Sequence, residues 1–379
     1  MDSVLKIGMV GLGDIAQVAY LENLHNPAGG IEVAGLCDIQ PERLEWASSQ
    51  VPSARATDDL EDLLEDSGIN WIFVLTPLLA HAPLIRRSLE AGKNVYTEKP
   101  ISVDFNEAAD LVELSRRKNL YLASAPVMLL YPVYEYVRSL VLSGAIGDVK
   151  AARVMASHGG PDSFPTATDL GWLMREEKAT AIPPLPDMGI YGFSWLAHVF
   201  GPAERVSAIA TIAKPERTFD KVTAPGFRPY TMNVKVKDNC IVSIEFAGGV
   251  LASVTANFVA GGHLPERFEM YGSEGTIMMP YKGPYVKIQS NLPPHNEPAG
   301  LHELDISDRD GGRAFQGVNW GPIVAAHLQR AVAMGAEPLI GRYFSLHIIE
   351  IISAAMESAR TGATRELETV FEHDKAWGI

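Results

Sequence analysis

The chain has 379 residues, a length that favours two domains, and its 32 Lys and Arg against 46 Asp and Glu give a net charge of -14. This acidic balance argues against a nucleic-acid partner, because phosphate binding depends on clustered positive charge. The two cysteines, Cys37 and Cys240, have no second Cys or His at metal-ligand spacing, so we predict core thiols and neither a disulfide framework nor a metal site.

The amino terminus has no basic region followed by an apolar run, and no stretch of about 18 apolar residues occurs. We therefore expect a cytoplasmic protein with no membrane partner.

Short apolar runs alternate with helical patterns from Leu5 to about Ala125. The predicted strands are Leu5-Val10, Ile31-Cys37, Trp71-Leu75, Asn94-Thr97 and Tyr121-Ser124. This alternation is typical of right-handed β-α-β units and predicts an α/β domain with a doubly wound parallel sheet. Thr57 is predicted to cap a short leucine-rich helix, and Gly92 to end a helix that begins near His81.

The pattern changes after Pro132, where a helix to about Leu142 is followed by segments that are mostly strand-like. These are Val149-Met155, Asn233-Val236, Ile241-Phe246, Val250-Phe258 and Phe268-Tyr271. The turn pairs Asp238-Asn239 and Gly248-Gly249 favour antiparallel hairpins. We expect a first domain over 1–126 and a second over 127–379, with a large, mainly antiparallel open sheet. Two late helical stretches, 323–334 and 344–359, could return to cover that sheet or the domain junction.

A glycine-rich turn follows the first predicted strand. Its residues, Gly11-Leu12-Gly13-Asp14-Ile15-Ala16, form a G-x-G-x-x-A pattern that opens a helix with Ile15, Val18 and Ala19 expected on one side. Gly11 permits the tight turn, Gly13 allows the backbone to approach a pyrophosphate, and Ala16 permits close packing. Such a triplet can also be a plain turn, but its place between strand and helix favours a dinucleotide site of the Rossmann type.

Asp38 stands at the end of the second predicted strand. Its carboxylate could accept hydrogen bonds from the adenosine ribose hydroxyls, and it could also cap the helix that starts near Pro41. A 2′-phosphate ~4 Å from this charge would be repelled by about 4 kcal/mol at an effective dielectric constant of ~20, so NAD is favoured over NADP. Ile39 replaces the usual cationic residue, although Arg43 is close enough in sequence to leave NADP as the less favoured alternative.

The next two strands also end in candidate site residues. Leu75-Thr76-Pro77, with His81 after it, and then Glu98-Lys99-Pro100 fall at the carboxyl ends of parallel strands, where open α/β sheets bind ligands. Thr76 and Pro77 are predicted to line the nicotinamide side of the site. The alternative is an ordinary strand-to-helix turn that contains proline.

Glu98-Lys99-Pro100 resembles the Glu-Lys-Pro motif of the Gfo/Idh/MocA oxidoreductases. The similarity extends in the expected order along nearly the whole chain, through 11–16, Asp38, 76–77, His81, 143–149, Asp187-Met188-Gly189, 271–275 and 357–362. The resemblance implies a Rossmann domain, a second domain whose open sheet makes homodimer or homotetramer contacts, and a sugar or polyol substrate. It also implies that NAD contacts Gly11, Leu12, Gly13, Asp14, Ile15, Asp38, Leu75, Thr76, Pro77, His81, Glu98 and Lys99.

The family's catalytic lysine corresponds to Lys99 and its aspartate to Asp187. Many members place an acid/base His four residues after that aspartate, where this chain has Tyr191. A phenol, with a reference pKa of about 10, is a poorer base than an imidazole at about 6.5 unless a cation such as Lys99 lowers its pKa. Ala181-Ile182-Pro183 also replaces glycines that often precede the aspartate, and no Arg occurs in 127–130.

Weaker candidates were weighed against ordinary structural roles. Trp172 could stack on a sugar ring, and His158, before Gly159-Gly160, could face the substrate, although a lone His near a loop is more often structural. Tyr131, Trp195, His263 and His347 have less support.

The leading hypothesis is an NAD-dependent dehydrogenase that acts on a secondary alcohol of a sugar, inositol or related polyol, with Lys99, Asp187 and Tyr191 as catalytic residues. The alternatives are a glycosidase-like enzyme that oxidises its substrate transiently, and a non-catalytic NAD-binding sensor.

Overall fold

The structure is a computed structural model that describes residues 4–163, 181–221, 228–261, 266–280, 285–293, 302–305, 319–373 and 377. The chain forms two compact units. The first takes in residues 1–130, 317–349 and 370–379, and the second takes in 131–316 and 350–369.

The first unit is built on a six-stranded parallel sheet in the order β3-β2-β1-β4-β5-β6. Its strands are β1 (Leu5–Val10), β2 (Ile31–Cys37), β3 (Arg55–Thr57), β4 (Trp71–Val74), β5 (Asn94–Thr97) and β6 (Leu122–Ser124). This is the doubly wound order that the alternating sequence pattern predicts. The sequence missed β3, because three partly exposed residues carry too little hydrophobic pattern.

Four helices connect these strands: α1 (Pro41–Gln50), α2 (Glu61–Leu64), α3 (His81–Glu90) and α4 (Phe105–Arg117). Gly92 follows α3 with φ +80°, as expected of a residue that ends a helix. The role predicted for Thr57 is wrong, since it ends β3 and its hydroxyl binds the Asp59 amide and Asp62, while Leu60 precedes α2 without a side-chain cap. The late helix α8 (Trp320–Met334) packs against the first unit's short helical segments.

The second unit contains a nine-stranded sheet in the order β16-β15-β14-β13-β7-β12-β11-β8-β17. All neighbours are antiparallel except β7 (Val149–Ser157) and β12 (Val250–Asn257). The other strands are β8 (Ala203–Thr211), β11 (Asn239–Phe246), β13 (Glu266–Gly272), β14 (Gly275–Pro280), β15 (Tyr285–Ser290), β16 (His302–Asp305) and β17 (Arg365–Glu366). The large, mainly antiparallel sheet predicted from the sequence is thus confirmed.

Helices α5 (Pro132–Leu142), α7 (Ile190–Phe200) and the second half of α9 (Arg342–Thr361) complete this unit. The sheet side chains alternate along each strand, so Val154, Val242 and Val254 are buried while their neighbours face outward. Gly248 and Gly249, both with φ +76°, turn the chain between β11 and β12 as predicted. Ser358 of α9 accepts a hydrogen bond from the Ala208 amide at 3.0 Å, which fixes this helix on β8.

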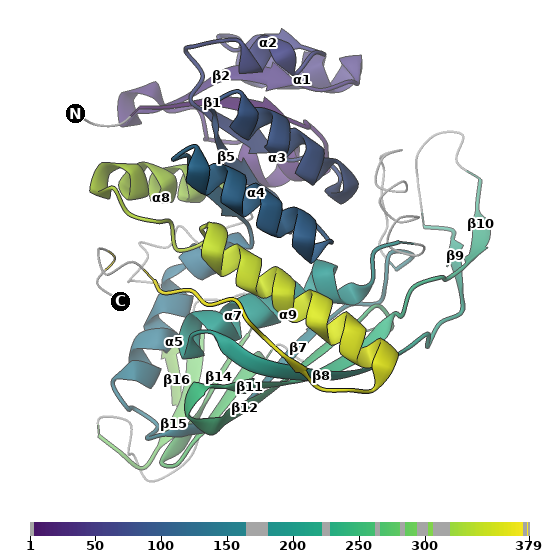
Figure 1. Cartoon of the computed structure of the whole chain (residues 1–379), viewed down its shortest axis with the longest axis vertical. Coiled ribbons are helices and arrows are strands. Elements are labelled where there is room, and N and C mark those ends of the chain that lie inside the picture. The colour runs from purple at the N-terminus through teal and green to yellow at the C-terminus, as the bar shows by residue number, and fades with distance from the viewer. Residues whose placement is uncertain are drawn as a thin grey trace. The chain divides into compact units, whose positions relative to one another are not determined.

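Two predictions in this unit are wrong. The strand expected at Asn233-Val236 lies earlier, as β10 (Tyr230–Asn233), which pairs with β9 (Glu216–Phe219) in a separate two-stranded ribbon (Figure 1). Asp238-Asn239 is not a hairpin turn, because the strand before it, β10, pairs with β9, whereas β11 pairs with β8 and β12 in the large sheet. The Asp238 carboxylate is instead buried and bound to Arg217.

Cys37 and Cys240 are buried free thiols, and burial raises their pKa to about 11 and about 12. Over the described ranges, no set of three or more His, Cys, Asp or Glu side chains could hold a metal ion. No helix in that part of the chain combines the length and apolar character needed to cross a bilayer.

Candidate active site

The glycine-rich turn after β1 is shaped by its backbone. Gly11 has φ +87°, and a Cβ there would collide with the Thr76 backbone nitrogen and the Leu75 carbonyl carbon at the end of β4. Its amide donates to the Cys37 carbonyl at 2.9 Å, which joins the turn to the end of β2. Only glycine therefore fits this position, as expected of the residue that makes the tight turn after β1.

Asp38 is bound to this turn. Its Oδ2 accepts a hydrogen bond from the Leu12 amide at 2.7 Å, and its Oδ1 accepts one from the Gln40 amide at 2.9 Å. The second bond forms a turn before α1, and α1 itself begins after Gln40 without a side-chain cap, so the helix-capping alternative is wrong. Asp38 thus sits beside the glycine turn at the carboxyl end of β2, the position that ribose recognition requires.

Arg43 of α1 also reaches this position. Its Nη1 lies 3.3 Å from Asp38 Oδ2, and its guanidinium lies 3.4 Å from where a Cβ on Gly13 would be. A cation therefore partly compensates the Asp38 charge, which the identity of Ile39 alone did not reveal. The signal in the sequence was the arginine five residues after Asp38, on the first turns of the next helix.

The helix after the glycine turn departs from its prediction. Residues Ala16–Tyr20 form a π-helix whose buried side chains are Ala16, Ala19 and Tyr20, whereas Val18 is 61% exposed. The wider turn places Tyr20 inward in place of Val18.

Tyr20 connects this helix to the Glu-Lys-Pro motif. Its hydroxyl donates to Glu98 Oε1 at 2.6 Å and lies 2.7 Å from the Tyr96 hydroxyl. Burial, followed by the charge of Glu98, raises the pKa of Tyr20 well above its usual value, so the phenol stays protonated as a donor. Sequence reasoning missed this network, because a tyrosine in a helix that was expected to be regular gives no sign of a partner 78 positions away.

Glu98 holds the backbone of Lys99. Its Oε2 accepts a hydrogen bond from the Lys99 amide at 3.0 Å while Oε1 receives the Tyr20 hydroxyl. Glu98 is buried and Lys99 half-buried at the carboxyl end of β5. Glu98 therefore fixes the main chain of Lys99, the candidate catalytic residue.

Thr76 and His81 follow β4 in the first unit. The Thr76 Oγ1 atom is buried and has no hydrogen-bond partner among the described residues. The two ring nitrogens of His81 each lie 2.8 Å from a carbonyl oxygen, those of Thr76 and Pro100, so this residue joins the loops after β4 and β5. Burial lowers the pKa of His81.

Asp187 and Tyr191, two of the predicted catalytic residues, belong to the second unit. Asp187 lies in a π-helix, Leu185–Gly189, that packs on β7 and β12, and Tyr191 follows in α7. Asp187 is 9% exposed and Tyr191 is half-buried. The Asp187 Oδ2 atom lies 3.8 Å from Nε2 of His158, which follows β7.

The weaker candidates divide into two groups. Trp195 and His347 are fully buried, with Trp195 packed on Phe268 at 4.7 Å, which fits structural roles. Trp172 and His263 lie outside the described residues.

Two family models match the chain. The oxidoreductase family model for the NAD-binding Rossmann fold matches residues 5–125, and the GFO/IDH/MocA C-terminal domain model matches residues 134–278. The chain belongs to the Gfo/Idh/MocA oxidoreductase family. The glycine turn, Asp38 and Thr76 are thus parts of an NAD-binding Rossmann domain.

Similar proteins include the uncharacterized oxidoreductase sll0816 of Synechocystis, 24% identical over 60% of this chain and 58% of that protein. Oxidoreductase P35 of Formosa agariphila is 26% identical over 54% of this chain and 64% of that protein, so the chain spans less than two thirds of either relative. Trans-1,2-dihydrobenzene-1,2-diol dehydrogenase of Mus musculus is 27% identical over 72% of this chain and 73% of that protein. A solved levoglucosan dehydrogenase in complex with NADH and levoglucosan has the same fold, with a TM-score of 0.81 at 22% identity over 96% of this chain and 100% of that one.

Proposed function

We propose that this protein is an NAD-dependent dehydrogenase that transfers a hydride between the nicotinamide and a secondary alcohol or ketone of a sugar, inositol or related polyol. The observation that carries the proposal is Lys99 at the carboxyl end of β5, its amide held by buried Glu98. Relatives named for a diol and for levoglucosan support hydroxyl compounds as the substrate class.

Residues 1–126 form the dinucleotide-binding domain in this proposal, and 127–379 the substrate-binding and oligomerisation domain. The cofactor would be held by Gly11, Leu12, Gly13, Asp14, Ile15, Asp38, Leu75, Thr76, Pro77, His81, Glu98 and Lys99. NAD, when bound, supplies the hydride acceptor. Lys99 and Tyr191 exchange the hydroxyl proton, and Asp187 orients these two residues. Tyr191 needs a nearby cation for this role, because its reference pKa of about 10 is high for a base at neutral pH.

A substrate screen that follows NADH absorbance tests the proposal. The panel holds levoglucosan, L-sorbose, D-glucose and myo-inositol, and one or more should be oxidised or, as the ketone, reduced. Release of free sugar from an aryl glycoside without net NADH would instead indicate the glycosidase-like reaction. NAD binding with no turnover of any compound would indicate a sensor.

Two variants then test the assigned roles. Lys99→Ala should abolish turnover and leave NAD binding largely intact, because the turn at Gly11 and the Asp38 carboxylate are unchanged. Tyr191→Phe should lower kcat by about 10²–10⁴-fold, the usual loss for an acid/base group, and Tyr191→His should be tolerated. Near-full activity of Tyr191→Phe would show that this tyrosine is only a wall residue.

A further inference from the structure

Tyr20 ends the π-helix that follows the glycine turn, and its side chain is completely buried in the first unit. Its hydroxyl donates to Glu98 Oε1 at 2.6 Å. The other oxygen of the same carboxylate accepts the Lys99 amide at 3.0 Å. One carboxylate therefore connects a phenol from the start of the chain with the main chain of the candidate catalytic lysine.

The orientation of the Glu98 carboxylate depends on both donors. Glu98 is 7% exposed, and a carboxylate so far from water needs hydrogen bonds to its oxygens. Tyr20 supplies the bond to Oε1 and the Lys99 amide the bond to Oε2. Rotation of the carboxylate would break one of these bonds. The Tyr20 hydroxyl therefore sets the orientation in which Oε2 meets Lys99.

Tyr20 is itself closely packed. Its ring makes an edge contact with Trp320 at the start of α8, with centroids 5.9 Å apart. Its hydroxyl also lies 2.7 Å from the hydroxyl of Tyr96 on β5. A Cβ on Gly321 would collide with the Tyr20 carbonyl oxygen, so α8 begins directly against this main chain. The hydroxyl is therefore held in a fixed place beside Glu98.

The π-helix brings Tyr20 to this place. The Leu21 amide donates to the Ala16 carbonyl at 2.8 Å, a bond that spans five residues instead of the four of an α-helix. The wider turn leaves Val18 exposed and Tyr20 buried. Such turns are rare and are found frequently at functional sites. The bond from Tyr20 to Glu98 gives this one a specific use.

The same helix is joined to the glycine turn. The Gln17 amide donates to the Gly13 carbonyl at 3.0 Å, and the Gln17 side-chain amide donates to the Leu12 carbonyl at 2.9 Å. A turn of this type is the part of a Rossmann domain that meets the pyrophosphate. Through the helix and Tyr20, this turn is therefore joined to Lys99.

We propose that Tyr20 is a positioning residue for Lys99. It acts through Glu98, so that the placement of the lysine depends on the helix that follows the glycine turn. The inference rests on the proposed function, because the part of Lys99 in proton transfer is what makes its placement matter. Tyr20 needs no contact with substrate or NAD for this role.

Hydrogen exchange of the Lys99 amide tests the contact in the free protein, without substrate or NAD. In protein labelled with ¹⁵N only at lysine, the Lys99 signal is assigned by its loss in Lys99→Arg. Tyr20→Phe keeps the ring against Trp320 and removes the donor. Exchange at Lys99 should then become about tenfold to a hundredfold faster, as for one weakened hydrogen bond to a charged group. An unchanged rate at Lys99 overturns the proposal.

Two controls separate this effect from a general loss of stability. The Lys93 amide, which donates to the Ser88 carbonyl at 3.0 Å, is read in the same spectra and should change by less than about threefold. Tyr96→Phe removes the other hydroxyl of the buried tyrosine pair and leaves the donor on Glu98, so exchange at Lys99 should stay close to its original rate. Equal acceleration of both lysine amides in Tyr20→Phe, or an equal effect of Tyr96→Phe on Lys99, overturns the proposal.

A double variant tests whether Tyr20 acts through Glu98. Glu98→Leu removes both acceptor oxygens, so exchange at Lys99 should rise at least as much as in Tyr20→Phe. Adding Tyr20→Phe to Glu98→Leu should then change the rate by less than about twofold, because the two substitutions break one pathway. Effects that multiply would show independent roles and overturn the proposal.

Turnover tests the consequence for catalysis. For a panel compound that is turned over, Tyr20→Phe should lower kcat about tenfold to a hundredfold, since a small displacement of a reacting group costs up to this much. KM for NAD should stay within about threefold, because Gly11 and Asp38 are unchanged. An unchanged kcat, or a loss confined to KM, overturns the proposal. If none of the four panel compounds is turned over, the proposed function fails, and exchange at Lys99 still decides whether Tyr20 positions this residue.

Discussion

Asp38 and Arg43 together set the charge at the adenosine end of the dinucleotide site. The carboxylate accepts from the Leu12 amide and pairs with the Arg43 guanidinium at 3.3 Å. The first contact holds Asp38 where a 2′-phosphate would meet a negative charge, and the second supplies a cation that the extra phosphate could use. The sequence alone predicted that Asp38 stands at the end of the second strand. For Arg43 it showed only that an arginine follows five residues later, and not that this arginine pairs with Asp38.

We expect NAD to bind more tightly than NADP, because ribose hydroxyls can donate to Asp38 and a phosphate cannot. Asp38→Ser should narrow the difference, and Arg43→Ala should weaken NADP more than NAD. Fluorescence titration of both cofactors against the three proteins measures this. Equal affinities in the unmodified protein would contradict the charge argument.

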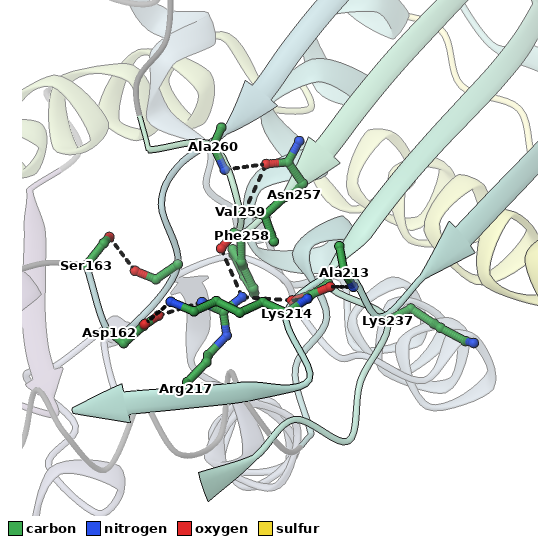
Figure 2. Close-up of polar contacts among 12 residues, drawn as sticks. Asp162, Ser163, Ala213, Lys214, Arg217, Lys237, Asn257, Phe258, Val259 and Ala260 are labelled. Carbon is green, nitrogen blue, oxygen red and sulfur yellow. Dashed lines mark hydrogen bonds and ion pairs between the residues drawn. The ribbon is translucent and has the colours of Figure 1, made fainter. Parts of the chain in front are cut away.

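Buried Arg217 joins the ribbon of β9 and β10 to segments next to the large sheet. Arg217, on β9, donates to Asp162 from the loop after β7 (Figure 2) and to Asp238 just before β11. Burial opposes ionisation of Asp162, but hydrogen bonds from Lys214 and Arg217 outweigh it and lower its pKa. The ion pairs of Arg217 with Asp162 and Asp238 therefore hold three segments of the chain together: 158–163, 214–217 and 238–240.

Arg217→Met should destabilise the protein by about 3–5 kcal/mol, since it leaves buried Asp238 without its cation and leaves Asp162 paired only with Lys214. The Asp162 contribution is present above the unfolded-state pKa, about 3.9, and is lost as the pH falls through the lower folded-state value. The cost of Asp162→Asn should therefore be full at pH 7 and shrink below about pH 4. Urea unfolding at several pH values measures both effects.

Arg205→Met is the matched control, because the pair of Arg205 with Glu245 joins β8 and β11 on the sheet surface, where Arg205 is half exposed. It should cost less than about 1 kcal/mol. A comparable loss in the two arginine variants would show that burial of the Arg217 cluster does not matter.

Elements that depend on the local sequence pattern were predicted correctly, and those that depend on contacts between distant segments were not. Strands such as β1, β2 and β5 were predicted almost to the residue, because buried parallel strands are continuous apolar runs bounded by turn residues. Val18 was predicted to be buried, but the π-helix at Ala16–Tyr20 turns Tyr20 inward in its place. Asp238 was predicted to form a hairpin turn, but its carboxylate binds buried Arg217. Both causes lie in contacts between distant segments, Tyr20 with Glu98 and Arg217 with Asp238, which no local pattern records.

At the scale of the whole molecule, the outward face of the large sheet carries an apolar row. Ile209 pairs in register with Ile241, which pairs with Thr255, and Thr255 pairs with Met155. The exposures of the three apolar side chains are 76%, 55% and 38%, and Leu251 on the same face is 58% exposed. Large apolar side chains that stand exposed on one face of a sheet in this way favour a contact between proteins.

We expect this face to join copies of the chain into a homodimer or homotetramer, because closed symmetry would bury the row on each copy. Light scattering at micromolar concentration should then give a mass of two or four times 41.2 kDa. Ile241→Glu places a charge at the centre of the row and should shift the mass toward that of one chain. Leu142→Glu, at a 60% exposed position at the end of α5, should leave the mass unchanged. A mass near 41.2 kDa for the unmodified protein at every concentration would rule out the assembly.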